Sequence, residues 1–115
     1  MGFGGLTMLG RTAASLFWMS RYIERAENIA RLTEVGYRIA LTPDIGSGHR
    51  EDWQSTLIAA ASLNAYQERH TNITAEKVQH FLLFDRDNPS SVRSCLETAR
   101  NNARAVRTAL TREMW

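Results

Sequence analysis

A repeated pattern of acid, amide and guanidinium side chains is the part of this sequence best suited to chemistry. The octapeptide ERAENIAR, residues 24–31, returns in thinned form as ETARNNAR, residues 97–104. In both copies a Glu, an Asn and an Arg stand at i, i+4 and i+7, a spacing that puts them in one column along a helix. The two columns are Glu24, Asn28 and Arg31, and Glu97, Asn101 and Arg104.

Two such columns would match in charge if their helices ran antiparallel. The matching pairs would then be Glu24 with Arg104, Asn28 with Asn101, and Arg31 with Glu97. An array of this kind could join the helices, or it could form a preformed polar site for a ligand. We therefore predict one connected polar network or candidate ligand-binding site, composed of Arg21, Glu24, Arg25, Asn28, Arg31, Glu97, Asn101 and Arg104.

Three interpretations of the columns remain open at this point. They could be the solvated outer faces of ordinary amphipathic helices, where each ion pair contributes only about 0.3–0.5 kcal/mol. They could instead be a buried or half-buried network between two helices, or a ligand site. Phe17 and Val35 share the polar side of the first helix, and a poor helix former, Asn, stands mid-helix in both copies. These two features favour the network.

Other kinds of site find little support. Helical bundles bind metal pairs through Glu-x-x-His motifs, but no His follows Glu24, Glu27 or Glu97 at the third position. Cys95 lies on an apolar helix face, where an inert core thiol is expected rather than a nucleophile. We accordingly predict no metal and no cofactor, and we assign no catalytic residue.

The length and composition indicate one helical domain. The chain has 115 residues, of which 43% are hydrophobic, enough for one modest core. Its single cysteine, Cys95, excludes an internal disulfide, and this favours a reducing cytoplasm. No apolar run approaches the roughly 18 residues of a membrane span. Residues 1–7 are interpreted as an extension or a cloning remnant, and residues 8–115 as the domain.

The positive charge of the chain comes almost entirely from arginine. Of 14 basic residues 13 are Arg, against 12 acids, and the pI is about 9.1. Arginine suits bidentate partners such as carboxylates and phosphates. The basic run of the last helix is interrupted by Glu97 and Glu113 and lacks aromatic residues for stacking on bases. We therefore do not expect nucleic-acid binding.

Helical spacing of apolar residues predicts an all-α fold, an antiparallel bundle of about four helices. The helices are expected at 11–41, at 51–68, from the N-cap Thr74 onward, and from Pro89 to Trp115 with Asn88 as the cap. Residues 42–49 are expected to be a mobile loop. The last helix keeps apolar residues to its end without a C-cap signal. This indicates a fragment of a larger helical protein, or a helix that packs on a partner.

Several motifs in order resemble those of the alpha-E domain family of bacteria, which is named for a Glu-Arg motif, here Glu24-Arg25. The similar stretches are MLGRTA at 8–13, LFWMSRYIERAENIAR at 16–31, FLLFDRDNPSS at 81–91, ARNNARAVR at 99–107 and REMW at 112–115. Family members are typically near three times this length, so the chain resembles their amino-terminal part.

The resemblance carries expectations about function and partners. Genes of the family lie beside those of ATP-grasp peptide-ligase-like and transglutaminase-like proteins, which implies an accessory or binding role in peptide or amide-bond metabolism. Self-association is a further expected interaction, and its basis is an apolar face that truncation would leave open in a fragment. The alternative is an enzyme in which Glu24 or Glu97 acts as general acid or base while arginines hold a carboxylate or phosphate. For this chain alone we favour the non-catalytic role.

Overall fold

The structure is a computed structural model, and it describes residues 2–43 and 49–114, with side chains from residue 9 onward. This part of the chain contains no strand, which confirms the all-α prediction. It forms five helices: α1 (Gly2–Ala40), α2 (Arg50–Ala59), α3 (Leu63–Gln67), α4 (Ala75–Leu83) and α5 (Val92–Met114).

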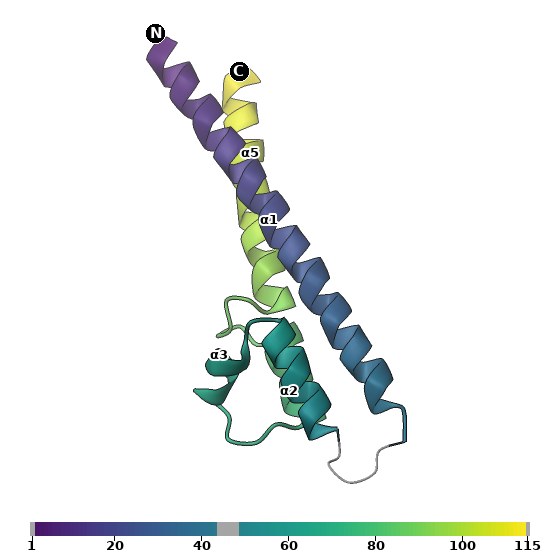
Figure 1. Cartoon of the computed structure of the whole chain (residues 1–115). Coiled ribbons are helices and arrows are strands. Elements are labelled where there is room, and N and C mark those ends of the chain that lie inside the picture. Colours follow the sequence, from purple (N-terminus) through teal and green to yellow (C-terminus); the bar gives the residue numbers. More distant parts are fainter. Residues whose placement is uncertain (1, 44–48, 115) are drawn as a thin grey trace.

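The two long helices form an arm, and the three short ones form a head at one end of it. α1 and α5 run antiparallel and side by side, so that residues near both ends of the chain lie at the tip of the arm (Figure 1). The head packs against the second half of α1. The molecule measures 69 × 26 × 17 Å, and along the arm it is only two helices wide.

A seven-residue repeat holds the arm together. The less exposed positions of α1 advance in alternating steps of three and four residues, as do those of α5. This spacing is that of a coiled-coil seam, in which each helix presents the same face along its length. The seam consists of Thr12, Ser15, Met19, Tyr22, Ala26, Ile29, Thr33 and Gly36 from α1, and Val92, Cys95, Ala99, Asn102, Val106 and Ala109 from α5.

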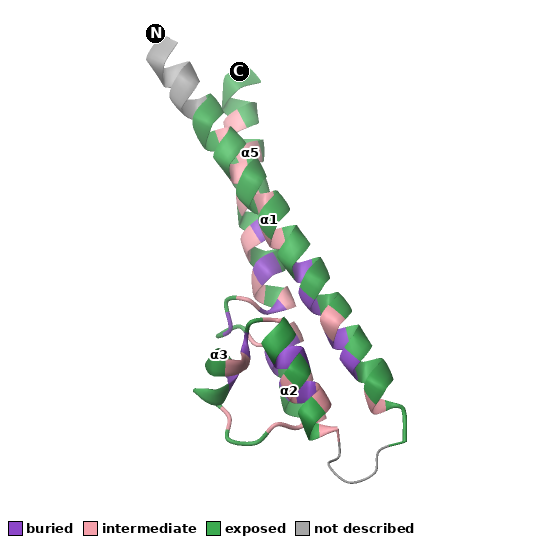
Figure 2. Ribbon diagram, viewed as in Figure 1, coloured by how far each residue is buried: buried purple, intermediate pink, exposed green. Residues whose placement is uncertain are grey.

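The apolar core lies in the head and the adjoining part of α1. Trp53 and Leu57 of α2, Tyr66 of α3 and Phe81 of α4 are almost completely buried, and Ile29 of α1 joins them. Buried residues are therefore concentrated at one end of the molecule, while the outer half of the arm is exposed or half-buried (Figure 2). The head anchors the arm because it contains most of the buried aromatic surface.

The single helix predicted over 51–68 is wrong: the chain breaks after Ala59. Ala61 adopts a left-handed conformation with φ 53°, and its amide donates to the carbonyl of Ile58 while the Ser62 amide donates to Leu57. This pair of hydrogen bonds is the Schellman arrangement that ends many helices. Glycine normally occupies that position, and because alanine stands there instead, no residue type in this stretch marks the end of the helix.

The two predicted N-caps differ in outcome. Thr74 caps α4 as expected, since its hydroxyl accepts from the Lys77 amide at 3.3 Å. Asn88 does not cap the last helix, because α5 begins three residues after Pro89 and the Ser91 hydroxyl accepts from the Ser94 amide at 3.1 Å. Ser91 is the better cap because it immediately precedes the first helical residue.

The remaining predictions concern the two ends of the chain, the loop after α1 and the crossing of a membrane. α1 begins at Gly2, so residues 2–7 continue the helix, and whether they belong to the domain stays a prediction. Most of the expected loop, residues 44–48, and Trp115 lie outside the described residues. Within the described part, no helix is both long and apolar enough to cross a membrane.

Candidate binding hollow around Glu24 and Arg25

A hollow on the surface of α1 gathers four of the eight predicted site residues. It has a volume of about 390 Å³. All of its lining comes from three turns of one helix, because positions three and four apart lie on one side of a helix. The lining residues are Trp18, Arg21, Tyr22, Glu24, Arg25 and Asn28. We refer to this site below as the hollow.

Its charged groups are held by contacts along α1 itself. Arg21 Nη1 lies 3.6 Å from Glu24 Oε2, and the guanidinium carbon of Arg25 lies 5.7 Å from the centre of the Tyr22 ring. The second contact has the geometry of a cation–π interaction, which orients the guanidinium without consuming its hydrogen-bond donors. Trp18 lies beside Tyr22, with ring centroids 6.2 Å apart.

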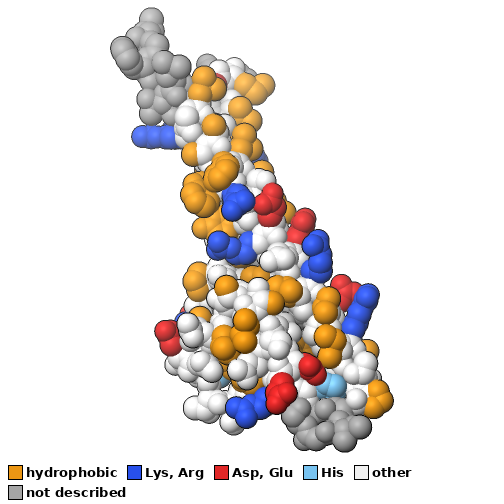
Figure 3. All heavy atoms as spheres, viewed as in Figure 1, with side chains coloured by type: hydrophobic (Ala, Val, Ile, Leu, Met, Phe, Trp, Pro, Cys, Tyr) orange, Lys and Arg blue, Asp and Glu red, His pale blue; other side chains and the backbone are white. Residues whose placement is uncertain are grey.

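The hollow is open to water. The side chains of Arg21 and Glu24 retain 63% and 64% of their accessible surface, and Trp18 is half exposed. Charged side chains of both signs gather midway along α1, between hydrophobic patches above and below (Figure 3). An exposed pair of this kind stabilises the fold by little, about 0–1 kcal/mol. Two guanidiniums against one carboxylate leave the hollow with a net positive charge, which suits an anionic group.

Cys95 of α5 lies close enough to the hollow to sense its charge. Burial raises the pKa of the Cys95 thiol, and the positive charge of Arg25 opposes part of that rise. The thiol is fully buried in the seam between α1 and α5. The expectation of a buried core thiol is confirmed.

The expected ladder between the two polar columns does not form. Glu24 pairs with Arg21 in its own helix, and Glu97 lies 3.4 Å from Nε of Arg93 in its own helix. Among the described residues no hydrogen bond or ion pair joins Glu24 to Arg104, Asn28 to Asn101 or Arg31 to Glu97. The second-copy residues Glu97, Asn101 and Arg104, with Arg31, do not line the hollow.

The seven-residue repeat explains this correction. The seam uses Tyr22, Ala26 and Ile29, so Glu24 and Arg31 fall on the side of α1 farthest from α5. Thr12 and Ser15 line a second hollow together with Ala105 and Ala109. This shared lining shows which residues of α1 and α5 lie at the same height along the arm. At that level Glu24 lies about two turns away from Arg104. The packing of the seam, and not the pairing of opposite charges, therefore determines which residues of the two helices face each other.

A family model described as "a predicted alpha-helical domain with a conserved ER motif" matches residues 8–115. The chain belongs to the Alpha-E family. Neither a curated protein nor a solved structure matches it. The Glu24-Arg25 pair of this Alpha-E domain lies in the hollow, and a second Glu-Arg pair, Glu68-Arg69, follows α3.

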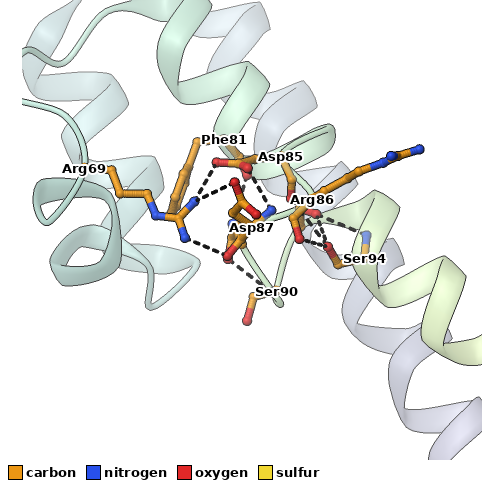
Figure 4. A network of polar contacts seen from close by, with 9 residues as sticks. Arg69, Phe81, Asp85, Arg86, Asp87, Ser90 and Ser94 are labelled. Atoms are coloured by element: carbon orange, nitrogen blue, oxygen red, sulfur yellow. Dashed lines mark hydrogen bonds and ion pairs between the residues drawn. The ribbon is translucent and has the colours of Figure 1, made fainter.

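Arg69 of this second pair anchors the turn between α4 and α5 (Figure 4). Its Nη1 lies 3.4 Å from Asp85 Oδ2, and its Nη2 donates to the carbonyl of Asp87 at 2.9 Å. Asp85 in turn accepts from the Asp87 amide at 2.9 Å. Sequence reasoning missed this network. The available signal was the pair of acids Asp85 and Asp87 just before an Asn-Pro pair, a composition that favours a turn held by side-chain hydrogen bonds.

The same turn is held from inside by a buried amide. Asn88 Nδ2 donates to the carbonyl of Phe81 at 2.9 Å, and its Oδ1 accepts from the Ser90 amide at 3.1 Å. The Ser94 hydroxyl donates weakly to the carbonyls of Asp85 and Arg86, both at 3.4 Å. These contacts fix the direction in which α5 leaves the head. We interpret the turn as structural support for the arm.

Other kinds of site chemistry find little support in the part of the chain that the structure describes. No group of three or more His, Cys, Asp or Glu side chains there is placed to hold a metal ion. Two further surface hollows have a different lining. One is lined by two arginines and six alanine, serine or threonine side chains, and the other by Glu97, Arg93 and Arg100 with four apolar side chains. The hollow around Glu24 and Arg25 is the strongest candidate site because it alone of the three gathers four of the eight predicted residues.

Proposed function

We propose that this Alpha-E domain is a non-catalytic binding module whose hollow receives an acidic or carboxylate-bearing segment of a partner protein. The observation that carries the proposal is the meeting of Trp18, Tyr22 and two arginines around one open hollow. Trp, Tyr and Arg are the residues that most often dominate the energy of protein interfaces. Their concentration on one helix supports a docking site.

The exposure of the hollow favours binding over catalysis. General acid–base catalysis gains most from groups in a site that excludes water, where electrostatic interactions are strong. Glu24 instead faces water from a single helix and already pairs with Arg21. An open, positively charged hollow with aromatic walls is better suited to hold a carboxylate than to transform it.

The partner we propose is an ATP-grasp peptide-ligase-like protein, with a transglutaminase-like protein as the second choice. This partner class rests on the resemblance to the Alpha-E family, whose genes accompany such proteins. The hollow supports a protein partner chemically, because guanidiniums bind the Asp and Glu carboxylates of an acidic docking segment in bidentate fashion. A cytoplasmic location, where ATP is available, is part of the same proposal.

The test is the affinity of the domain for the neighbouring ATP-grasp ligase-like protein, measured by isothermal titration calorimetry. We expect Arg25→Ala and Trp18→Ala each to weaken binding at least about tenfold, equivalent to about 1.4 kcal/mol. Arg104→Ala is the matched control, because Arg104 is an exposed arginine outside the hollow. No binding by the wild type, or equal loss in all three variants, would overturn the proposal.

An enzymatic role is the alternative, and one observation favours it. A carboxylate or phosphate held by Arg25 and Asn28 would lie beside Glu24, which lines the same hollow. Glu24 could then act as a general acid or base. Product formation by the reconstituted system decides between the two: Glu24→Gln should abolish it in the enzymatic case and leave it intact when only docking is required.

A further inference from the structure

We propose that two copies of this chain associate through an apolar face on the flank of the arm, forming a four-helix bundle. The face, called here the leucine face, consists of Leu16 and Ile23 of α1 and Leu96 and Leu110 of α5. Each of these side chains keeps between 37% and 50% of its surface exposed. The proposal is independent of the binding role given to the hollow.

The seven-residue repeat places these four side chains next to the seam. Leu16 and Ile23 are seven residues apart, and each directly follows a seam residue, Ser15 or Tyr22. Leu96 likewise follows Cys95, and Leu110 follows Ala109. In coiled coils an apolar residue at this flanking position widens the apolar stripe beyond what one partner helix can cover.

The two stripes lie on the same side of the arm. The opposite flank of each helix is marked by Arg11 and Ala105, which stand directly before the seam residues Thr12 and Val106. These two residues line one hollow, together with Arg112. Since the opposite flanks meet on one side of the arm, the flanks bearing Leu16, Ile23, Leu96 and Leu110 must meet on the other.

The size of the leucine face suits a stable dimer. α5 has 23 residues, and a helix of that length is about 35 Å long. Two helices about 10 Å apart make a layer about 20 Å wide, so the side of the arm that contains the leucine face offers about 700 Å². A standard protein interface buries about 800 Å² on each partner.

The whole molecule also has more surface than a compact chain of its mass. Its accessible surface is 8278 Å², against about 6300 Å² expected for a monomer of 13.0 kDa. Its radius of gyration is 18.9 Å, against about 13 Å for a compact domain of this length. An arm two helices wide and one helix thick is the cause (Figure 1). A second arm packed on it would supply the missing layer.

The charged side chains along the two edges of the leucine face are opposite in sign, so they can pair with those of a second copy. The α1 edge carries Glu27 and Glu34, whereas the α5 edge carries Arg93, Arg100 and Arg107. Glu34 also pairs with Arg38 at 2.7 Å and Arg93 with Glu97 at 3.4 Å, both exposed pairs within one helix. A two-fold axis parallel to the helices lays α1 of one copy on α5 of the other, so that each acidic edge meets a basic edge. An end-for-end arrangement would bring like charges together, which is unfavourable.

Sedimentation velocity on the untagged chain, at concentrations up to about 0.1 mM, tests the proposal. We expect the wild type to dimerise and Leu96→Glu to raise the dissociation constant at least about 100-fold, because the two-fold axis doubles the substitution. Leu110→Glu should act similarly. Phe17→Glu is the control, since Phe17 is 57% exposed but lies on the outer side of α1. Circular dichroism confirms that each variant keeps its helices.

The result that overturns the proposal is a monomeric wild type, which would assign the face to a different chain. Dimers unaffected by both leucine variants would equally overturn it, because another surface would then join the copies. The arrangement has its own test: Glu27→Arg should weaken association about fivefold, and adding Arg93→Glu should restore it. Association that is unchanged by the single charge reversal would exclude the arrangement along a parallel two-fold axis.

Discussion

Gly36 of α1 lies directly against the indole ring of Trp53 in α2. A Cβ at position 36 would come within 2.9 Å of Trp53 Cζ3 and equally close to the hydroxyl of Thr56. Trp53 is 1% exposed and lies at the centre of the core, so it has little room to move. The close approach of α1 to α2 therefore depends on a glycine that is buried near the carboxyl end of a long helix.

We expect Gly36→Ala to destabilise the domain by about 1–3 kcal/mol, because the added methyl overpacks the core. The free energy of unfolding in urea measures this change. Gly10→Ala is the matched control, since a Cβ at position 10 meets nothing within 4 Å. There the better helix propensity of alanine should stabilise by up to about 1 kcal/mol. Equal effects at the two sites would contradict the packing.

Ala61 offers a stabilising substitution. It holds a left-handed conformation, with φ 53°, that glycine adopts at lower cost. We expect Ala61→Gly to raise the free energy of unfolding by about 0.5–1 kcal/mol. Ala13→Gly, in the exposed middle of α1, should lower it by about the same amount. A loss of stability at position 61 would show that the break between α2 and α3 does not need this conformation.

Asn88 and Asn101 should differ strongly although both are asparagines in or near α5. Asn88 is 4% exposed and satisfies the Phe81 carbonyl and the Ser90 amide, so Asn88→Ala should cost about 1–3 kcal/mol. Asn101 is exposed, and Asn101→Ala should be neutral or slightly stabilising because alanine favours helices. Thermal unfolding of both variants checks the contrast. Similar losses would mean that Asn101 takes part in a network after all.

Local features of the fold were predictable from the sequence, and features that depend on the packing of distant segments were not. Thr74 was identified as a cap because its signal lies within four residues. The helix end at Ala61 was not predicted because alanine rarely adopts a left-handed conformation. Asn88 was assigned to the wrong role because its partner, Phe81, lies in the preceding helix, and no spacing rule connects the two.

In the candidate site, too, the grouping of residues along one helix was predictable, and their pairing with a distant helix was not. The position of Arg21, Glu24, Arg25 and Asn28 on one side of α1 followed from helical periodicity, and the hollow brings them together. The expected pairing with α5 failed because the seam sets which residues face that helix. The small residues of the seam, such as Ala26 and Ala99, indicate which side of each helix faces the other. They are a weaker signal in the sequence than matched charges.

Stability should fall in alkaline solution through two buried groups. Burial raises the pKa of Cys95 above its ordinary 9.0 and that of Tyr66 above its ordinary 10.0. Between the unfolded and folded pKa values the folded state binds the proton more tightly. The contribution of these groups to the free energy of unfolding is therefore fully present below about pH 9. Above that pH the free energy of unfolding declines, by at most about 1.4 kcal/mol per pH unit for each group.

The contribution of the thiol can be separated from that of the phenol. Cys95→Ala should reduce the slope of stability against pH between about pH 9 and pH 10, whatever its effect at neutral pH. Urea unfolding at a series of pH values measures the slope. Ala99→Gly is the control, because it alters the same buried seam without removing a titrating group and should leave the slope unchanged. An unaltered slope in Cys95→Ala would mean that the folded state does not protect this thiol.

A double-mutant cycle on Glu24 and Arg104 tests the correction to the polar ladder. Both side chains lie on the outer sides of their helices, about two turns apart along the arm, so Glu24→Gln and Arg104→Met should have additive effects. We expect a coupling energy below about 0.3 kcal/mol. Glu24→Gln with Arg21→Met is the positive comparison, because these residues form an ion pair at 3.6 Å, and it should give about 0.3–0.5 kcal/mol. A coupling of 1 kcal/mol or more between Glu24 and Arg104 would require the two helices to slide until the columns meet. That shift would break the seam between Ala26 and Cys95, and the same cycle therefore tests the packing of the whole arm.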